Sequence, residues 1–204
     1  LNEFYNYRDK IQFIKNSTEM CSGFCAEGYT KSRSLYIPGV VVTTSGPGLT
    51  NCITSLQNAY SDGSPLILIS CQVPLNSIGT DAFQECNAIE LTRSCTKWNK
   101  QIKHKDEIYE ALNTAFNCSL DSRKGPVHID IPKDILLNEI EETYKKKTPI
   151  FTEPNYIAKN IDNLIDKFVE KLNQSKRPVI IAGQGCINSY ELLTDISIKY
   201  NIPV

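Results

Sequence analysis

The chain has 204 residues, of which 41% are hydrophobic and 22% are charged, and its 22 Lys and Arg nearly balance its 23 Asp and Glu. This length is sufficient to bury a substantial core, and the balanced charge argues against a dedicated nucleic-acid-binding protein, which usually has a basic excess. No run of about 18 apolar residues is present, so we expect neither a membrane-spanning helix nor a membrane partner.

The first expected elements are a helix, a strand and a second helix. Small residues dominate 18–29, which predicts a helix that another element can approach closely, packed inside an interface and not on a wet surface. The β-branched run at 39–44 predicts a strand, and it ends in a glycine-rich turn at 45–48. Residues 49–60 then carry apolar side chains at helical spacing.

Two more apolar runs, at 65–70 and 127–131, predict further strands, and a helical pattern at 106–118 precedes the second of them. Runs that are apolar on both faces and are separated by helices are typical of a parallel sheet covered on both sides. We therefore predict an α/β fold, a parallel sheet flanked by helices.

A change of composition at 139–155 predicts a linker, because this stretch is charged, contains two prolines and lacks periodicity. We accordingly expect one domain at 1–138 and the beginning of a second α/β domain at 156–204. The elements expected in the second domain are a helix at 156–172, a strand at 177–183, a helix at 189–200 and a strand from 202. A domain cut after one such unit cannot bury its sheet, so we expect the chain to be a piece of a longer protein.

The eight cysteines do not follow a recognisable zinc pattern. They include no Cys-x-x-Cys pair, and the chain has only two His, whereas zinc sites use closely spaced pairs of ligands. Several lie in apolar runs, as Cys71 does, where a thiol behaves as a small hydrophobic side chain. We therefore predict reduced, structural cysteines and no metal site in this chain.

The turn at 45–48 joins a strand to a helix, where free backbone N–H groups can hold an anion or the polar edge of a cofactor. A dinucleotide-binding site is disfavoured. Asn51 stands where the dinucleotide-binding motif has its third Gly, and the next strand ends in Gln72 instead of an acidic residue. The alternative is a tight turn that needs glycine for its backbone angles. His104 and His128 have no Ser or Cys partner at a recognisable spacing, so we predict no hydrolytic triad.

Several polar residues have an ordinary structural interpretation when each is taken alone. Glu19, Lys97, Arg123 and Lys133 would be solvated surface charges. The polar loop at 78–85 follows a buried strand, at the edge of a parallel sheet where ligands gather.

Five segments together carry a family resemblance. They are T-S-G-P-G-L-T-N at 44–51, Q-V-P at 72–74, I-G-T-D-A-F-Q-E at 78–85, T-R-S-C-T-K-W-N at 92–99, and G-P-V at 125–127 with I-P-K-D at 131–134. With them the chain resembles the catalytic subunits of acetolactate synthase (acetohydroxyacid synthase), which are thiamine diphosphate enzymes. The first segment is shared with the wider superfamily, and the third is more specific to acetolactate synthases.

The resemblance implies a thiamine diphosphate-binding fold, with 1–138 as the pyrimidine-binding domain lacking its first strand and 156–204 as the start of an FAD-binding-type domain. It implies decarboxylation of pyruvate on thiamine diphosphate, followed by condensation with pyruvate or 2-oxobutyrate in branched-chain amino-acid biosynthesis. Glu19 would be catalytic, because its carboxylate matches the one that bonds N1′ of the cofactor's aminopyrimidine and favours its imino tautomer.

The other functional residues implied by the resemblance fall into three groups. The cofactor-binding group is Pro47, Asn51 and Gln84. The substrate-channel group is Pro74, Phe83, Lys97 and Lys133. The FAD group is Arg123, Gly183 and Gly185.

The resemblance also implies partners and a compartment. Mg²⁺ would be held by ligands outside these residues, the catalytic subunits would form a homodimer or tetramer, and a regulatory small subunit would be a possible partner. The enzyme would be cytoplasmic in a bacterium and mitochondrial or plastidic in a eukaryote, and we expect this chain alone to be inactive. The alternatives are another thiamine diphosphate-dependent enzyme, a 2-keto acid decarboxylase or pyruvate oxidase, and a non-catalytic module of the same fold.

Overall fold

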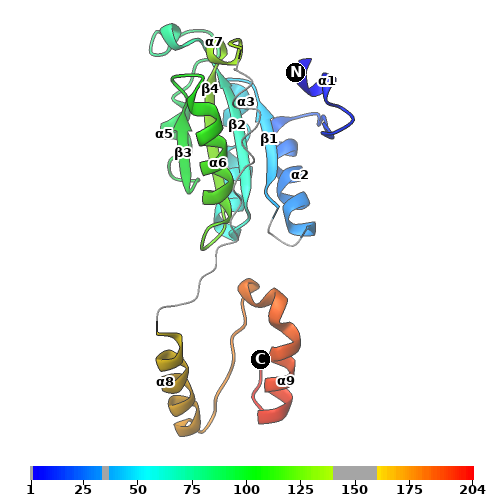
Figure 1. The fold of residues 1–204 in the computed structure, drawn as a ribbon, viewed down its shortest axis with the longest axis vertical. Helices are drawn as coiled ribbons and strands as arrows, with labels where there is room; N and C mark the ends of the chain where they lie inside the picture. Colours follow the sequence, from blue (N-terminus) through cyan, green and yellow to red (C-terminus); the bar gives the residue numbers. More distant parts are fainter. Residues whose placement is uncertain (1, 34–36, 140–159) are drawn as a thin grey trace. The chain divides into compact units, whose positions relative to one another are not determined.

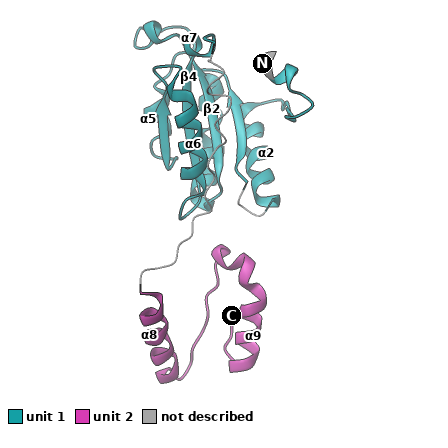
Figure 2. Ribbon diagram, viewed as in Figure 1, with its two compact units in different colours: residues 1–154 teal, residues 155–204 magenta. Residues whose placement is uncertain are grey.

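The computed structural model describes residues 2–33, 37–139 and 160–204 (Figure 1). The chain divides into two compact units, residues 1–154 and residues 155–204 (Figure 2). The domain boundaries expected at 138 and 156 stay predictions, because the expected linker at 139–155 lies almost wholly outside the described residues.

The first unit alternates helices and strands. Its elements in chain order are α1 (Asn2–Asn6), α2 (Glu19–Ser32), β1 (Gly39–Thr43), α3 (Pro47–Thr50), α4 (Ile53–Asp62), β2 (Leu66–Gln72), the 3₁₀ turn η1 (Leu75–Ser77), α5 (Ala88–Thr92), β3 (Trp98–Gln101), α6 (Glu107–Leu120), β4 (Pro126–Pro132) and α7 (Lys133–Leu136). Within the described parts of the chain, no helix combines the length and apolar character needed to cross a membrane.

The four strands form one sheet in the order β1-β2-β4-β3, and every pair is parallel. In the register, Ile67 of β2 lies between Val40 of β1 and Val127 of β4. The predicted parallel α/β fold is therefore confirmed.

The sheet separates two apolar clusters, because successive side chains of a strand point to opposite faces. Leu66 and Leu68 of β2 join the cluster that includes residues of α2, α4 and α5. Ile67 of the same strand joins the second cluster, which includes residues of α6 and α7. Figure 1 shows α6 lying along the sheet beside β2 and β4, which it contacts.

Helix α2 begins after Thr18, whose side-chain oxygen accepts a hydrogen bond from the Cys21 N–H at 3.2 Å. Its small residues serve a close approach within the unit: a Cβ added to Gly23 would lie 1.9 Å from Ser55 Oγ of α4. The expected close approach is therefore confirmed, with α4 as the partner, whereas the expected burial inside an interface stays a prediction because Met20, Phe24 and Tyr29 are exposed in this chain.

Two expectations for the first unit need correction. The single helix expected at 49–60 is two helices, α3 and α4, which meet at Asn51 and Cys52. Strand β3 was not expected, because Trp-Asn-Lys-Gln has no apolar run and each of its residues is half-buried at the edge of the sheet.

The second unit contains α8 (Ile161–Gln174), the 3₁₀ turn η3 (Gln184–Ser189) and α9 (Tyr190–Tyr200), in agreement with the two helices expected there. The strands expected at 177–183 and from 202 are wrong, since neither segment has strand structure. The Ile180 N–H bonds the Pro203 carbonyl at 2.9 Å, but one bond is not a ladder, and a strand needs a neighbour along its length.

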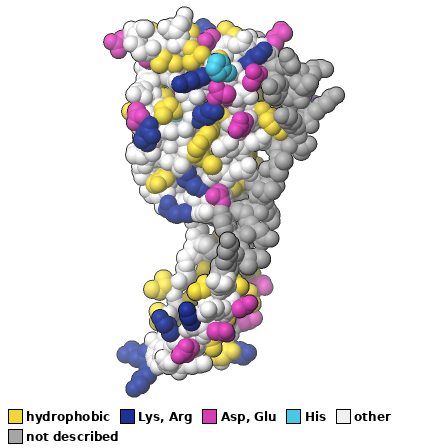
Figure 3. Space-filling model, turned by 60° about the vertical axis from the view of Figure 1, so that its left-hand side comes forward, with side chains coloured by type: hydrophobic (Ala, Val, Ile, Leu, Met, Phe, Trp, Pro, Cys, Tyr) yellow, Lys and Arg dark blue, Asp and Glu magenta, His cyan; other side chains and the backbone are white. Residues whose placement is uncertain are grey.

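Charged side chains of both signs are interspersed on the face of the molecule in Figure 3. This surface agrees with the near-equal numbers of basic and acidic residues in the sequence.

Candidate functional site

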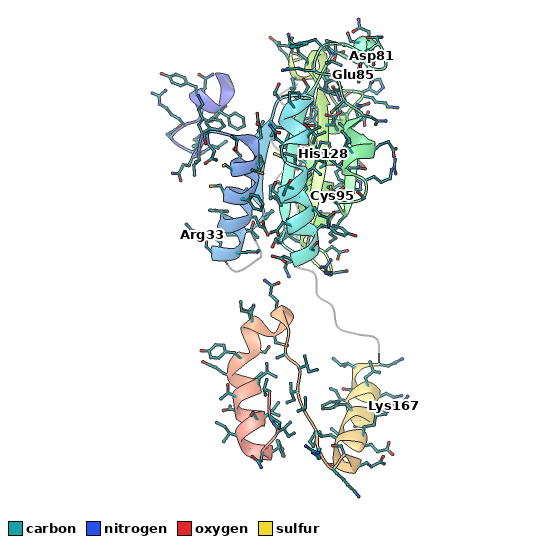
Figure 4. The ribbon with its side chains drawn as sticks, turned by 180° about the vertical axis from the view of Figure 1, so that it is seen from behind. Arg33, Asp81, Glu85, Cys95, His128 and Lys167 are labelled. Carbon is teal, nitrogen blue, oxygen red and sulfur yellow. The ribbon has the colours of Figure 1, made fainter. Side chains whose placement is uncertain are left out.

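The candidate site lies where the parallel strands end, at their carboxyl edge. The chain leaves β1 into the turn at 45–48 and leaves β2 into a loop that runs to residue 86. Because carboxyl ends of parallel strands share one edge of a sheet, these two segments lie near each other. Figure 4 shows Asp81 and Glu85 of the loop at this end of the sheet, and Arg33, which follows α2, at the other end.

Glu19 is the first residue of α2 and is half-buried. Its Oε2 accepts a hydrogen bond from Asn51 Nδ2 at 3.0 Å, and the Cys52 thiol donates to its backbone carbonyl at 3.3 Å. The bond from Asn51, followed by a bond from the backbone N–H of Glu19 itself, lowers the pKa of the Glu19 carboxyl. Glu19 is therefore an ionised carboxylate fixed against the segment that follows the glycine-rich turn.

The glycine-rich turn has a backbone that demands glycine at Gly46, where φ is +50°. A Cβ at this position would also lie 2.5 Å from the carbonyl oxygen of Gln84. The loop that carries Gln84 therefore rests directly on the turn that leads to Asn51.

The loop at 78–86 is organised by the carboxylate of Glu85. It accepts hydrogen bonds from the backbone N–H groups of Gly79 and, at 3.1 Å, of Ala82. These backbone donors, Gly79 first, lower the pKa of the Glu85 carboxyl. Asp81 and Gln84 have positive φ values of 58° and 61°, an uncommon conformation for residues with a side chain that is worth a functional explanation.

A buried network of polar side chains lies beneath this edge, centred on Asp130 of β4. Its Oδ1 accepts from Ser70 Oγ at 2.5 Å, and its Oδ2 accepts from Gln72 Nε2 at 3.3 Å and Gln101 Nε2 at 2.9 Å. Burial raises the pKa of Asp130, and the three hydrogen bonds oppose that shift. The network places a carboxyl group inside the sheet, bonded on both oxygens.

His128, on the same strand as Asp130, extends the network to α5. Its Nε2 lies 2.8 Å from Ser70 Oγ and its Nδ1 lies 2.9 Å from Thr92 Oγ1. Since the Ser70 hydroxyl donates to Asp130, we infer that Nε2 carries the proton of a neutral ring. Burial lowers the pKa of His128 to about 3. The sequence spacing did not indicate the contact of His128 with Ser70, which the fold creates between β4 and β2.

The structure brings part of the predicted site together. Glu19 and Asn51 are bonded, Pro47 begins α3 beside the turn, and Gln84 packs on that turn. Phe83, next to Gln84, is 89% exposed, so it faces solvent.

Two predicted channel residues lie at the same edge on neighbouring strands. Pro74 follows β2 and Lys133 follows β4. The segments are tied together, because the Leu75 N–H donates to Asp134 Oδ1 at 3.1 Å.

The structure does not bring Lys97 and Arg123 to this group. Both precede strands, at the amino edge of the sheet. The Lys97 ammonium donates to the carbonyls of Cys118 and Asp121 at the end of α6, and desolvation lowers its pKa. Arg123 Nη2 donates to the carbonyl of Ser61 at 2.6 Å.

Gly183 and Gly185 belong to the second compact unit, described by itself, where they flank Gln184 at the start of η3. A Cβ added to either glycine would meet no heavy atom within 4 Å. Among the described residues of both units, no group of three or more His, Cys, Asp or Glu is arranged to hold a metal ion.

Sequence reasoning assigned no role to Gln72, Glu85 and Asp130, which shape the edge of the sheet. One signal was available for two of them, since Gln72 and Asp130 are polar residues inside apolar strand sequences. Buried polar groups need partners, so such positions predict a network, although the pattern does not identify its members.

Residues 1–91 match the family described as "Thiamine pyrophosphate enzyme, N-terminal TPP binding domain". The chain is 36% identical over 205 residues to "Acetolactate synthase catalytic subunit, mitochondrial" of Saccharomyces cerevisiae, an alignment that covers 96% of the chain and 30% of the relative. It is 40% identical over 199 residues to "Acetolactate synthase large subunit" of Lactococcus lactis, covering 95% of the chain and 34% of the relative.

A plant relative, "Acetolactate synthase, chloroplastic" of Arabidopsis thaliana, is 37% identical over 185 residues, covering 89% of the chain and 27% of the relative. The chain thus spans about a third of the length of these curated relatives.

Proposed function

We propose that the protein is an acetolactate synthase, because residues 1–91 match the thiamine pyrophosphate enzyme N-terminal domain and the chain is similar to acetolactate synthase catalytic subunits. It decarboxylates pyruvate on thiamine diphosphate and transfers the two-carbon unit to pyruvate or 2-oxobutyrate, in branched-chain amino-acid biosynthesis. The observation that carries this proposal is the hydrogen bond between Glu19 and Asn51 at the carboxyl edge of the sheet.

The residues at this edge fit the aminopyrimidine of the cofactor. Glu19 has a lowered pKa and is partly open to solvent, so it offers an ionised acceptor to a ring N–H, a charge-assisted bond worth about 1.5–3 kcal/mol. Asn51 orients that carboxylate, while Pro47 and Gln84 lie at the turn that leads to Asn51. When bound, thiamine diphosphate supplies the nucleophilic carbon and the electron sink for decarboxylation.

The substrate side of the proposal uses Pro74, Phe83 and Lys133. Lys133 begins α7 at the same edge as Pro74, and its positive charge would attract the carboxylate of a 2-keto acid. The exposed Phe83 ring offers apolar surface to the methyl or ethyl end of the substrate. Lys97 belongs to this group by resemblance alone, since its ammonium is bonded to two carbonyls at the other edge.

The proposed Mg²⁺ would serve the diphosphate and be held by residues outside this chain. FAD is proposed from the resemblance alone: Gly183 and Gly185 border open space, and Arg123 Nη2 is bonded to the Ser61 carbonyl. Flavin binding by these three residues stays a prediction of the resemblance, tested by the visible absorbance of the purified full-length protein.

We further propose that the catalytic subunits form a homodimer or tetramer and that a regulatory small subunit is a possible partner. The α2 face beside Glu19 supports an interface, because Met20 and Phe24 are 44% and 41% exposed. The proposed compartment follows the source: cytoplasm in a bacterium, mitochondrion or plastid in a eukaryote.

The test is product analysis with the full-length protein, thiamine diphosphate, Mg²⁺ and pyruvate. Cofactor-dependent formation of 2-acetolactate supports the proposal. Acetaldehyde as the product would identify a 2-keto acid decarboxylase instead, and acetyl phosphate a pyruvate oxidase. The chain of 204 residues, assayed by itself under the same conditions, should form no acetolactate.

A further inference from the structure

Gln72, the last residue of β2, connects the buried network to the loop at 78–86. It is 3% exposed, and its Nε2 donates to Asp130 Oδ2 at 3.3 Å and to the carbonyl of Cys86 at 3.1 Å. One amide nitrogen therefore bridges the centre of the sheet and the end of the loop.

The orientation of this amide is determined by its neighbours. The Gln72 Oε1 accepts a hydrogen bond from the Val73 N–H at 2.9 Å, while the two hydrogens on Nε2 face a carbonyl and a carboxylate. A flipped amide would set oxygen against both of these oxygens and nitrogen against a donor. The side chain thus has one satisfied position, and in it all three of its hydrogen-bonding functions are used.

Both ends of the bridge are anchored. On the sheet side, Asp130 is bonded by Ser70 and Gln101 as well as by Gln72. On the loop side, the Cys86 carbonyl also accepts the Ala88 N–H of α5 at 2.8 Å.

The bridge leads to the candidate site, because the loop touches the glycine-rich turn a second time through the Gln84 carbonyl, which lies where a Cβ of Gly46 would be. A movement of residue 86 relative to the sheet would therefore displace Gln84 and its neighbour Phe83.

We propose that Gln72 is a positioning residue, which holds the loop at 78–86 against the sheet so that Gln84 stays over the turn at 45–48. The assignment of that edge to thiamine diphosphate rests on the function proposed above. We call the hydrogen bonds of Gln72 to Asp130 and to the Cys86 carbonyl the clamp. The clamp does not depend on the proposed function.

The experiment compares Gln72→Met with Gln101→Met in the full-length protein. Each variant removes one Nε2 donor from Asp130 Oδ2 and replaces it with an apolar side chain of similar length. Gln72→Met also removes the side-chain bonds to the Cys86 carbonyl, which keeps its bond from the Ala88 N–H, and to the Val73 N–H. Gln101→Met therefore controls for the damage at Asp130.

Two measurements are made on both variants. Hydrogen–deuterium exchange of the peptide covering 78–86 should be faster in Gln72→Met and should match wild type in Gln101→Met. The thiamine diphosphate dissociation constant, from equilibrium dialysis, should rise about 5- to 10-fold in Gln72→Met, the factor for one neutral hydrogen bond, and stay unchanged in the control.

Equal loosening of the loop in both variants, or no loosening in Gln72→Met, would overturn the clamp and leave Gln72 as a core residue only. If Gln72→Met fails to fold, Gln72→Asn replaces it, because the shorter amide cannot reach both partners. The hydrogen–deuterium exchange measurement needs no cofactor. If the wild-type protein binds no thiamine diphosphate, the proposed function is refuted, but the exchange comparison still tests whether Gln72 holds the loop.

Discussion

The side chain of Asn51 donates a hydrogen bond to the carboxylate of Glu19 at 3.0 Å across 32 residues of sequence. This bond joins the first residue of α2 to the segment after the glycine-rich turn. Because it also lowers the pKa of Glu19, the same contact that positions the carboxylate keeps it ionised.

Replacement of Glu19 by Gln in the full-length protein should reduce kcat about 10- to 150-fold. The amide keeps the size of the side chain but loses the charge, and a charge-assisted hydrogen bond is worth about 1.5–3 kcal/mol. The measurement is the rate of acetolactate formation at saturating thiamine diphosphate.

The matched control is Glu27→Gln, on the same helix. Glu27 is buried, accepts hydrogen bonds from Asn58 Nδ2 and pairs with the Lys31 ammonium at 2.9 Å, so loss of its charge should lower thermal stability and leave kcat near wild type. Full activity of the Glu19 variant would favour the non-catalytic module.

Replacement of Gly46 by Ala should destabilise the protein by about 1–3 kcal/mol, since a side chain is strained at φ +50° and its Cβ would collide with the Gln84 carbonyl. Urea unfolding measures the effect. Gly28→Ala is the control, because a Cβ there meets open space on a helix, and it should stabilise by about 0.5–1 kcal/mol. Equal behaviour of the two variants would show that the turn tolerates a side chain.

His128 should make the protein less stable in mild acid. Its pKa is about 3 in the folded chain and about 6.5 when unfolded, so the unfolded state binds the extra proton between these values and stability falls as the pH drops below about 6.5. The cost attributable to His128 is about 2 kcal/mol at pH 5.

His128→Gln isolates this contribution, because Gln retains a donor and an acceptor but does not titrate. The wild type should lose about 2 kcal/mol more than the variant between pH 7 and pH 5 in urea unfolding. Asp130, whose raised pKa acts with the opposite sign, is present in both proteins and therefore cancels in the comparison. Parallel pH profiles would contradict a neutral buried His128.

The two lysines predicted for the channel should behave differently. Lys133→Met should raise the KM for pyruvate roughly 3-fold, in keeping with the ~0.5–1 kcal/mol of an exposed charge interaction, and the increase should vanish at high salt. Lys97→Met should leave KM unchanged and lower stability by about 1 kcal/mol through its lost bonds to the end of α6. A raised KM for pyruvate in the Lys97 variant would show that Lys97 does belong to the substrate channel.

The strands were predictable from the sequence where they contain an apolar or β-branched run, as the edge strand β1 and the central strands β2 and β4 do. The runs of β2 and β4 are apolar because both strands are central, whereas β3 is an edge strand with polar residues and gives no such signal. The segment at 177–183 has the composition of a strand but not its structure, since pairing depends on a neighbour that composition does not specify.

The candidate site was predictable only in its parts. The glycine-rich turn and Glu19 could be found from local sequence and resemblance. The bonds that assemble them could not, because Asn51 meets Glu19 and Gln72 meets Asp130 across 32 and 58 residues. Such contacts depend on the order of the strands in the sheet.

That order has a consequence for how the molecule is made. Ile67 pairs with Val127, 60 positions further along the chain, so the central pair of the sheet closes a long loop, and pairings of this kind fold slowly. During synthesis β2 can pair with β1, but its other edge stays unpaired until β4 has left the ribosome. In that interval one edge of the apolar strand β2 is unpaired and can pair with strands of other chains. We therefore expect the yield of native protein to depend on chaperone supply and growth temperature.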